Sequence, residues 1–268
     1  MRHRRDRKRR IRFEVIATIA VAIICIVAVY LLKIRSSEAY RKQKAGLSIP
    51  TYSGRPFVEI NGNKPYFLEE EYSTESFEVY SDLDSLGRCG VAFANVSREL
   101  MPTEPRGEIG SIKPTGWVQA KYEGVVESNP PYLYNRCHLI AYCLTAENAN
   151  EKNLITGTRY MNVVGMLPFE EQVARYLDAN DNHVLYRVTP IFEGRNLVAS
   201  GVLMEAYSVE DKGAGVSFCV YVYNVQPGIE IDYATGKSKI KDILVIPITS
   251  NNCLDRKFPM CLYSPLII

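Results

Sequence analysis

The chain is poor in histidine, has a single tryptophan, and contains no internal repeat and no low-complexity tract in its 268 residues. The absence of repeats argues against solenoid and propeller architectures. Only His3, His138 and His183 could supply an imidazole, so chemistry that depends on this group has few candidates. The seven cysteines lack the paired spacing of the common zinc modules.

A basic excess is also missing outside the first 44 residues. Residues 1–44 carry 13 Lys and Arg against 3 Asp and Glu, and the other 224 residues carry 19 against 27. Attraction to phosphates is a main source of nonspecific nucleic-acid affinity, so bulk charge does not favour such binding by the folded part. A nucleic-acid ligand would need a local basic patch and a bound cation.

The N-terminus predicts a membrane anchor. Eight basic residues lie between Met1 and Arg12, and residues 15–32 then run without a charge. At ~1.5 Å per residue a helix of this length spans about 27 Å, enough for the hydrocarbon core of a bilayer. The run is longer than the apolar part of a typical cleaved signal peptide, so an anchor is the preferred interpretation. The positive-inside rule places the N-terminus in the cytoplasm and the remainder outside the cell.

We divide the chain into five segments. They are a basic cytoplasmic tail (1–14), a transmembrane helix (15–32), a juxtamembrane linker (33–48), a folded domain (49–240) and an unassigned C-terminal segment (241–268). Six cysteines follow the predicted span. In an exported domain they could form up to three disulfides, and in an anaerobic host they would stay reduced.

The folded domain is predicted to be α+β. Residues 101–117 should form a loop because Gly and Pro recur there. Residues 168–178 fit a helix, since Pro168 suits a first turn and apolar residues share one face. Strands are predicted at 58–60, 90–93, 183–189, 197–208 and 216–225. The last three have short connections and should form an antiparallel meander within a central sheet.

His138 is the histidine best placed for chemistry. His3 lies in the basic tail, and His183 begins a predicted strand, where a structural role is more common. Arg136 precedes His138 by two residues, so both side chains share a face of an extended chain. Alone the pair is a weak signal, and a buried, hydrogen-bonded histidine is the competing interpretation.

A segment rich in asparagine follows. Asn153 and Asn162 are nine residues apart, and Glu170 comes eight residues later. Asparagine disfavours helix interiors, so the cluster requires capping, turns or ligation as its reason. Amide and carboxylate oxygens are ligands that Mg²⁺ prefers.

With these residues the segment from about 53 to 236 resembles the DNA/RNA non-specific endonucleases. That family belongs to the ββα-metal (His-Me finger) nucleases, and the similar branch is that of the streptococcal competence nuclease and the streptodornases. The family's Asp-Arg-Gly-His signature corresponds to residues 135–138, here Asn-Arg-Cys-His. Residues 113–117, 223–228 and 232–236 also resemble this branch. The resemblance implies an α+β fold with a central antiparallel sheet and a ββα-metal finger active site.

The resemblance also implies a function: hydrolysis of phosphodiester bonds in DNA and RNA without sequence preference, with Mg²⁺ or Mn²⁺ as cofactor. His138 would be the general base, Asn162 the direct metal ligand, and Glu170 would hold the water shell of the ion. Asn153 would orient His138 or the phosphate, and Arg136 would lie near the scissile phosphate. Candidate contacts to the nucleic-acid backbone are Arg106, Lys113, Lys121 and Arg159. With the anchor, the enzyme would act at the outer surface of a bacterial membrane, and no protein partner is implied.

Two positions depart from the family signature. Asn135 replaces an aspartate and so removes a carboxylate, and Cys137 replaces a glycine and so limits positive φ. Cys137 could pair with Cys143 or Cys89. The departures motivate a second hypothesis, a membrane-anchored nucleic-acid-binding protein that has lost catalysis. A third hypothesis is a zinc protein in which these three cysteines and His138 supply the ligands.

Overall fold

The computed structural model describes residues 47–241. The predicted cytoplasmic tail and membrane span lie outside this range, as do Cys25, Cys253, Cys261 and nearly all of the C-terminal segment. Between residues 47 and 241, no helix combines the length and the apolar character needed to cross a bilayer.

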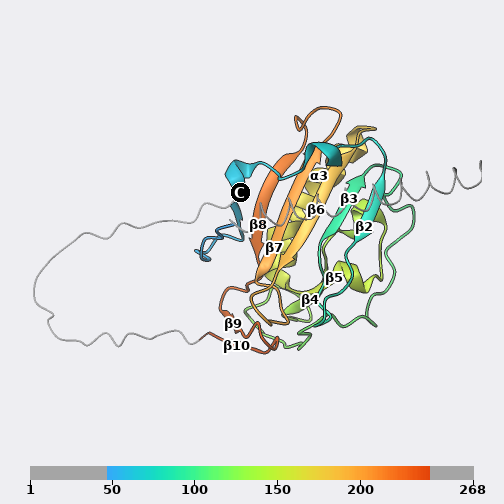
Figure 1. Ribbon diagram of the computed structural model, residues 1–268. Coiled ribbons are helices and arrows are strands. Elements are labelled where there is room, and N and C mark those ends of the chain that lie inside the picture. Colours follow the sequence, from blue (N-terminus) through green and yellow to red (C-terminus); the bar gives the residue numbers. More distant parts are fainter. Residues whose placement is uncertain (1–46, 242–268) are drawn as a thin grey trace, which may run out of the picture.

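A six-stranded sheet forms the centre of the described fold (Figure 1). Its strands are β1 (Phe57–Glu59), β2 (Phe77–Tyr80), β3 (Ala92–Val96), β6 (Val184–Ile191), β7 (Gly201–Ser208) and β8 (Ser217–Tyr223). The spatial order is β1-β8-β7-β6-β3-β2, and every neighbouring pair is antiparallel. The predicted meander is therefore confirmed as β6, β7 and β8, although the middle strand begins at Gly201 rather than at residue 197.

A second unit follows β3 in the chain. Its elements are β4 (Tyr134–His138), α2 (Tyr142–Thr145), the 3₁₀ turn η3 (Glu151–Asn153), β5 (Leu154–Thr158), the π-helical turn η4 (Met161–Met166) and α3 (Leu167–Ala179). Strands β4 and β5 form a separate antiparallel pair, with His138 opposite Leu154. The predicted helix is confirmed as α3, with Pro168 in its first turn as expected.

The two faces of the central sheet are covered by different parts of the chain. On one face, alternate side chains of β3, β6, β7 and β8 pack against α3 and the β4–β5 unit in the largest apolar core. On the other face, residues 47–66 pack over Leu203, Tyr221 and Tyr223. Because both faces are covered, residues of both alternating sets are buried along β6 and β7.

Smaller elements complete the described chain. They are the 3₁₀ turns η1 (Asn61–Asn63) and η2 (Glu69–Glu71) and the strand pair β9 (Ile229–Ile231) and β10 (Ser238–Ile240). Residues 97–133 contain no strand or helix longer than a single bridge or turn, which confirms the predicted loop at 101–117. This long irregular segment contributes much of the wall of the cavity described next.

Candidate active site

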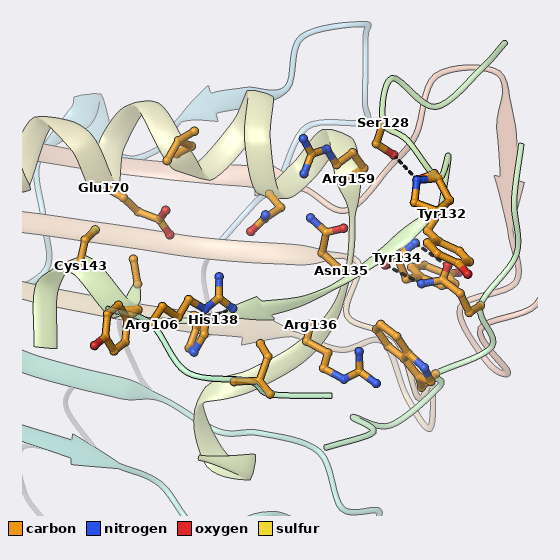
Figure 2. Close-up of a pocket in the computed structure, with 18 of the residues that line it drawn as sticks. Arg106, Ser128, Tyr132, Tyr134, Asn135, Arg136, His138, Cys143, Arg159 and Glu170 are labelled. Atoms are coloured by element: carbon orange, nitrogen blue, oxygen red, sulfur yellow. Dashed lines mark hydrogen bonds between the residues drawn. The ribbon is translucent and has the colours of Figure 1, made fainter. Parts of the chain in front are cut away.

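A cavity of about 900 Å³ opens beside β4, η4 and the first turn of α3. Six of the predicted functional residues line it: Arg106, Arg136, His138, Arg159, Asn162 and Glu170. Glu170 and Arg159 lie on one side, and Arg106, His138 and Arg136 lie on the other (Figure 2). Residues that are up to 64 positions apart in the sequence thus share one hollow.

Strand β4 places two of these side chains. Arg136 and His138 both line the cavity, while the Cys137 side chain between them is fully buried in the core. This is the alternation that an extended chain imposes, and it confirms that Arg136 and His138 share a face. Hydrogen bonding to β5 holds the strand in register.

Two contacts determine the tautomer of the His138 ring. Nε2 lies 2.8 Å from the carbonyl oxygen of Asn148, which can only accept a hydrogen bond, so Nε2 carries the proton. Nδ1 lies 3.4 Å from a guanidinium nitrogen of Arg106, which can only donate. Nδ1 is therefore unprotonated, with its lone pair directed at Arg106, and an unprotonated nitrogen is what a general base requires.

The surroundings of His138 keep the ring neutral. Burial lowers the pKa of His138 to about 4, with the Arg106 charge adding to the decrease and the hydrogen bond to Asn148 opposing it. The residue is 7% exposed. At neutral pH the ring is thus unprotonated at Nδ1.

Glu170 lies in the first turn of α3 and is a buried carboxyl group without a partner. It makes no hydrogen bond and no ion pair with any residue between 47 and 241, and it is only 6% exposed. Burial, together with the neighbouring charge of Glu171, raises the pKa of Glu170 to about 8, and Arg106 opposes this effect. A buried carboxylate is costly unless a cation or hydrogen bonds compensate its charge. A metal ion in the cavity would supply this missing compensation.

Asn162 supplies the second oxygen. It is the second residue of η4 and lines the same cavity. Its Oδ1 accepts a hydrogen bond from the thiol of Cys137 at 3.0 Å, which uses one of the two lone pairs of a carbonyl oxygen. An amide oxygen and a carboxylate fit a Mg²⁺ ion that keeps most of its water shell.

Asn153 binds the backbone that follows β4. The side chain is fully buried, its Oδ1 accepts from the backbone nitrogen of Ile140, and its Nδ2 donates to the carbonyl of the same residue, both at 2.9 Å. These bonds do not involve the His138 ring, and Asn153 is not among the residues that line the cavity, so its role of orienting His138 or the phosphate stays a prediction. Asn153 instead fixes the chain two residues after His138, where β4 has ended and no ladder hydrogen bond is available.

Arg136 lines the cavity, but its guanidinium is occupied. It donates to the carbonyl oxygens of Ile112 and Gly110, the latter at 2.7 Å, and it lies over the ring of Trp117 at 4.4 Å. These contacts tie the irregular loop to β4. The guanidinium of Arg106 is the one that contacts the base, which the sequence could not show because Arg106 lies in a loop without periodicity.

Two lysines predicted to contact nucleic acid are located elsewhere. Lys113 lines a separate cavity of about 300 Å³, and the amine of Lys121 lies 5.0 Å from the ring centre of Tyr132. Lys113 is therefore not part of the hollow that contains His138, and its contact with a nucleic-acid backbone stays a prediction. Arg159 is in that hollow, immediately after β5.

Comparison with known proteins identifies the family. A model of the DNA/RNA non-specific endonuclease family matches residues 68–210. The chain belongs to this family. It is 33% identical over 110 residues to a deoxyribonuclease of Streptococcus dysgalactiae subsp. equisimilis, an alignment that covers 39% of this chain and 32% of that protein. The match thus spans about a third of the length of this relative.

Solved structures show the same fold. NucA from Streptococcus agalactiae with a bound magnesium ion superposes with a TM-score of 0.62 at 24% identity, covering 75% of this chain and 93% of that chain. The Sda1 nuclease with a bound zinc ion superposes with a TM-score of 0.59 at 23% identity, covering 71% and 100%. The family's α+β architecture with a central antiparallel sheet is therefore present here.

Within this family the chain accommodates its two departures locally. Asn135 lines the cavity. Cys137 has ordinary extended backbone and is not among the described residues with positive φ, so the glycine that it replaces is not needed for conformation. Gly157 on β5 makes the room: a Cβ there would lie 2.7 Å from the Cβ of Cys137.

The four cysteines between residues 47 and 241 of this endonuclease-family chain do not pair or gather around a metal. Cys89, Cys137, Cys143 and Cys219 are free thiols, so the suggested pairing of Cys137 is wrong. Cys89 donates to the carbonyls of Glu151 and Leu154, away from Cys137. No three His, Cys, Asp or Glu side chains within residues 47–241 form a metal-binding group, and the four-ligand zinc site is therefore contradicted.

Proposed function

We propose that the protein is a metal-dependent endonuclease that hydrolyses phosphodiester bonds of DNA and RNA without sequence preference. One observation carries the proposal: a neutral His138 with an unprotonated Nδ1 lines the same cavity as Asn162 and Glu170, whose side chains carry oxygens. A base and a site for a hard cation are the two components that metal-assisted phosphodiester hydrolysis needs.

His138 takes a proton in the proposed reaction. Nδ1 accepts it from the water that attacks phosphorus, and the phosphodiester bond to the leaving 3′-oxygen breaks. The carbonyl of Asn148, held at Nε2, stabilises the imidazolium that forms. A divalent cation held by Asn162, with its water shell held by Glu170, would supply charge stabilisation at the phosphate and the leaving oxygen.

Arg106 changes partner when substrate binds. In the free protein its guanidinium approaches the Nδ1 of His138, the atom that must face the attacking water. A phosphate in the cavity is a stronger acceptor than a neutral imidazole, because the hydrogen bond is then charge-assisted on both sides. Arg106 thus releases Nδ1 and neutralises the phosphate, and Arg159 offers a second contact. Contacts of this kind carry no sequence information, which fits action on both nucleic acids.

We further propose that the enzyme works at the outer surface of a bacterial membrane. The support is the basic cluster before residue 13 and the uncharged run at 15–32. An anchored enzyme outside the cell would meet extracellular nucleic acid.

The direct test is cleavage by the full chain in detergent micelles. Plasmid DNA and RNA are incubated with the wild type and Mg²⁺, with the wild type and EDTA, and with the His138→Ala variant and Mg²⁺. Cleavage should occur only in the first mixture, because loss of a general base lowers the rate by about 10²–10⁴-fold. Equal cleavage by the variant, or cleavage in EDTA, would contradict the proposal.

A second variant assigns the base itself. His138→Gly should be inactive and should regain cleavage when imidazole is added, because the free base can occupy the vacated space. Binding of DNA without cleavage under any divalent ion would favour the alternative of an inactive nucleic-acid-binding protein, which the loss of a carboxylate at Asn135 suggests.

A further inference from the structure

Cys137 precedes the proposed base His138 on β4, and its side chain points to the opposite side of the strand. Its side chain is fully buried, and its sulfur lies 3.0 Å from Oδ1 of Asn162 and 3.5 Å from the sulfur of Met166. The cysteine therefore connects the strand that bears His138 to the π-helical turn that bears the predicted metal ligand.

The thiol has little freedom to move. A Cβ on Gly157 would lie 3.2 Å from the sulfur of Cys137 and 2.6 Å from the terminal methyl group of Met161. The side chain thus fills the space that Gly157 leaves between β5 and η4. Close-packed interiors hold side chains in one rotamer, so the sulfur of Cys137 has one position.

The contact has a definite direction. A thiol in apolar surroundings stays protonated and donates, whereas the side-chain amide of Asn162 can present either its oxygen or its nitrogen. The S–H group selects the oxygen and uses one of its two lone pairs. The second lone pair remains for a cation in the cavity that Asn162 lines.

The conformation around Asn162 makes such a contact useful. Met161–Met166 form a π-helical turn, whose wider backbone is uncommon and frequent at functional sites. Apart from the cysteine, no residue in the described range forms a hydrogen bond with the side chain of Asn162. Without the thiol, the amide could rotate about its terminal bond and present nitrogen instead of oxygen.

We propose that Cys137 is a positioning residue that orients the amide of Asn162 so that its oxygen faces a divalent cation. The inference rests on the proposed function, because it assumes that Asn162 binds the metal. It assigns a purpose to the cysteine in the His138 signature: the thiol acts through Asn162 and does not touch the substrate.

Three variants of the full chain in detergent micelles test this role. Cys137→Ala removes the donor, Cys137→Ser retains one, and Cys219→Ala is the matched control. Cys219 is equally buried, but it lies on the far face of the sheet, away from the cavity. Partners that orient metal ligands typically change metal affinity by about 10–100-fold, and the weak S–H donor belongs at the lower end.

The first measurement is Mg²⁺ binding without substrate, by calorimetry and by the Mg²⁺-dependent rise in Tm. Cys137→Ala should weaken binding about 10-fold, Cys137→Ser should restore most of the affinity, and Cys219→Ala should match the wild type. In the cleavage assay, Cys137→Ala should need about 10-fold more Mg²⁺ for half-maximal rate, with kcat at saturating Mg²⁺ within about 2-fold.

The second measurement does not depend on a metal or on folding of the Cys137→Ser variant. The infrared S–H stretching band of Cys137, identified by its loss in Cys137→Ala, should shift to higher frequency in Asn162→Ala. That shift reports loss of the acceptor and remains informative if Cys137→Ser does not fold.

Unchanged Mg²⁺ affinity in Cys137→Ala, or an unshifted S–H band in Asn162→Ala, would overturn the inference while leaving endonuclease activity intact. Wild-type protein that binds Mg²⁺ but cleaves nothing would overturn the proposed function, and the binding series would still decide the role of Cys137. Wild-type protein that binds no Mg²⁺ and cleaves nothing would overturn both.

Discussion

Two buried glutamates, one behind each face of the central sheet, have opposite surroundings. Glu205 on β7 is fully buried, and it accepts hydrogen bonds from Arg187 at 3.0 and 3.2 Å and from the backbone nitrogen of Tyr66 at 2.7 Å. Glu170 on α3 is nearly as buried but has no hydrogen bond or ion pair with any residue that the structure describes.

The comparison separates a carboxyl group that the fold compensates from one that it leaves uncompensated. Arg187 also donates to Glu71 and to the carbonyl of Tyr66, so the pair on β6 and β7 fastens the N-terminal segment to the sheet. No described residue forms a hydrogen bond or an ion pair with Glu170 in this way, and burial raises the pKa of its carboxyl group. A buried ionisable group that the fold does not compensate is a candidate ligand for a cation, because natural interiors rarely leave such groups alone.

The largest expected effect is on the free energy of unfolding when the ion pair of Glu205 with Arg187 is broken. Arg187→Leu leaves Glu205 buried without its ionic partner, which should destabilise the fold by about 3–5 kcal/mol. Denaturant unfolding of the full chain measures the loss. The control is Arg175→Leu, which removes an exposed pair with Glu171 and should change stability by less than about 1 kcal/mol. Equal losses in both variants would show that the buried pair is not special.

Glu170→Gln should make the metal-free protein more stable than the wild type at high pH. The raised pKa means that the folded state retains the proton between about pH 4.5 and 8 while the unfolded state releases it. Metal-free wild type therefore loses stability as pH rises through this range, and the glutamine variant should not. The variant should also lose about 10–100-fold in Mg²⁺ affinity. Tm recorded at pH 5 and 8, with and without Mg²⁺, provides the check, and parallel Tm curves would refute it.

Asn153→Ala should destabilise the turn after β4. Two buried backbone groups of Ile140 lose their partners, at a cost of about 1–3 kcal/mol. Because the side chain does not reach the cavity, Mg²⁺ affinity measured at low temperature should stay within about 2-fold of the wild type. A larger change in affinity than in stability would instead support the predicted role of Asn153 at the site.

The smallest expected effect is a shift in the pH at which kcat/KM falls to half, which His138 sets as the proposed base. His138 with a pKa near 4 stays neutral where an ordinary histidine is half protonated, so kcat/KM at saturating Mg²⁺ should not halve near pH 6.5 but at a lower pH. Folding stability should also fall as pH falls. The contribution of the neutral buried ring is complete above pH 6.5 and is lost as pH falls toward 4. Arg106→Gln should move the midpoint of the kcat/KM profile upward, since it removes a positive charge near the ring. An unmoved midpoint would argue that burial alone sets the pKa.

Local patterns in the sequence were sufficient for several parts of this molecule. Alternating β-branched and aromatic residues with short connections specify the meander of β6, β7 and β8, because side-chain period and turn length are local properties. The Pro168 start and the apolar stripe specify α3 in the same way. The spacing of Arg136 and His138 placed both on one face of a strand, whatever that strand pairs with.

Other features depended on contacts between distant residues. The pairing of β4 with β5 joins segments about 20 positions apart, and the approach of Arg106 to His138 crosses an irregular loop. Neither has a periodic signature. Lys113 and Arg159 are both basic residues that the sequence offers as backbone contacts, yet only Arg159 lines the cavity.

The sequence by itself determined which chemical groups were available: one imidazole in a signature, an asparagine and a glutamate at family spacing, and a cysteine in place of a glycine. Only the tertiary structure decided their state. Burial depends on what packs from elsewhere in the chain, and burial makes His138 neutral, leaves Glu170 without a counter-charge, and places the thiol of Cys137 against Asn162. These properties arise from the dielectric and the packing around a group, which no residue carries in its own identity.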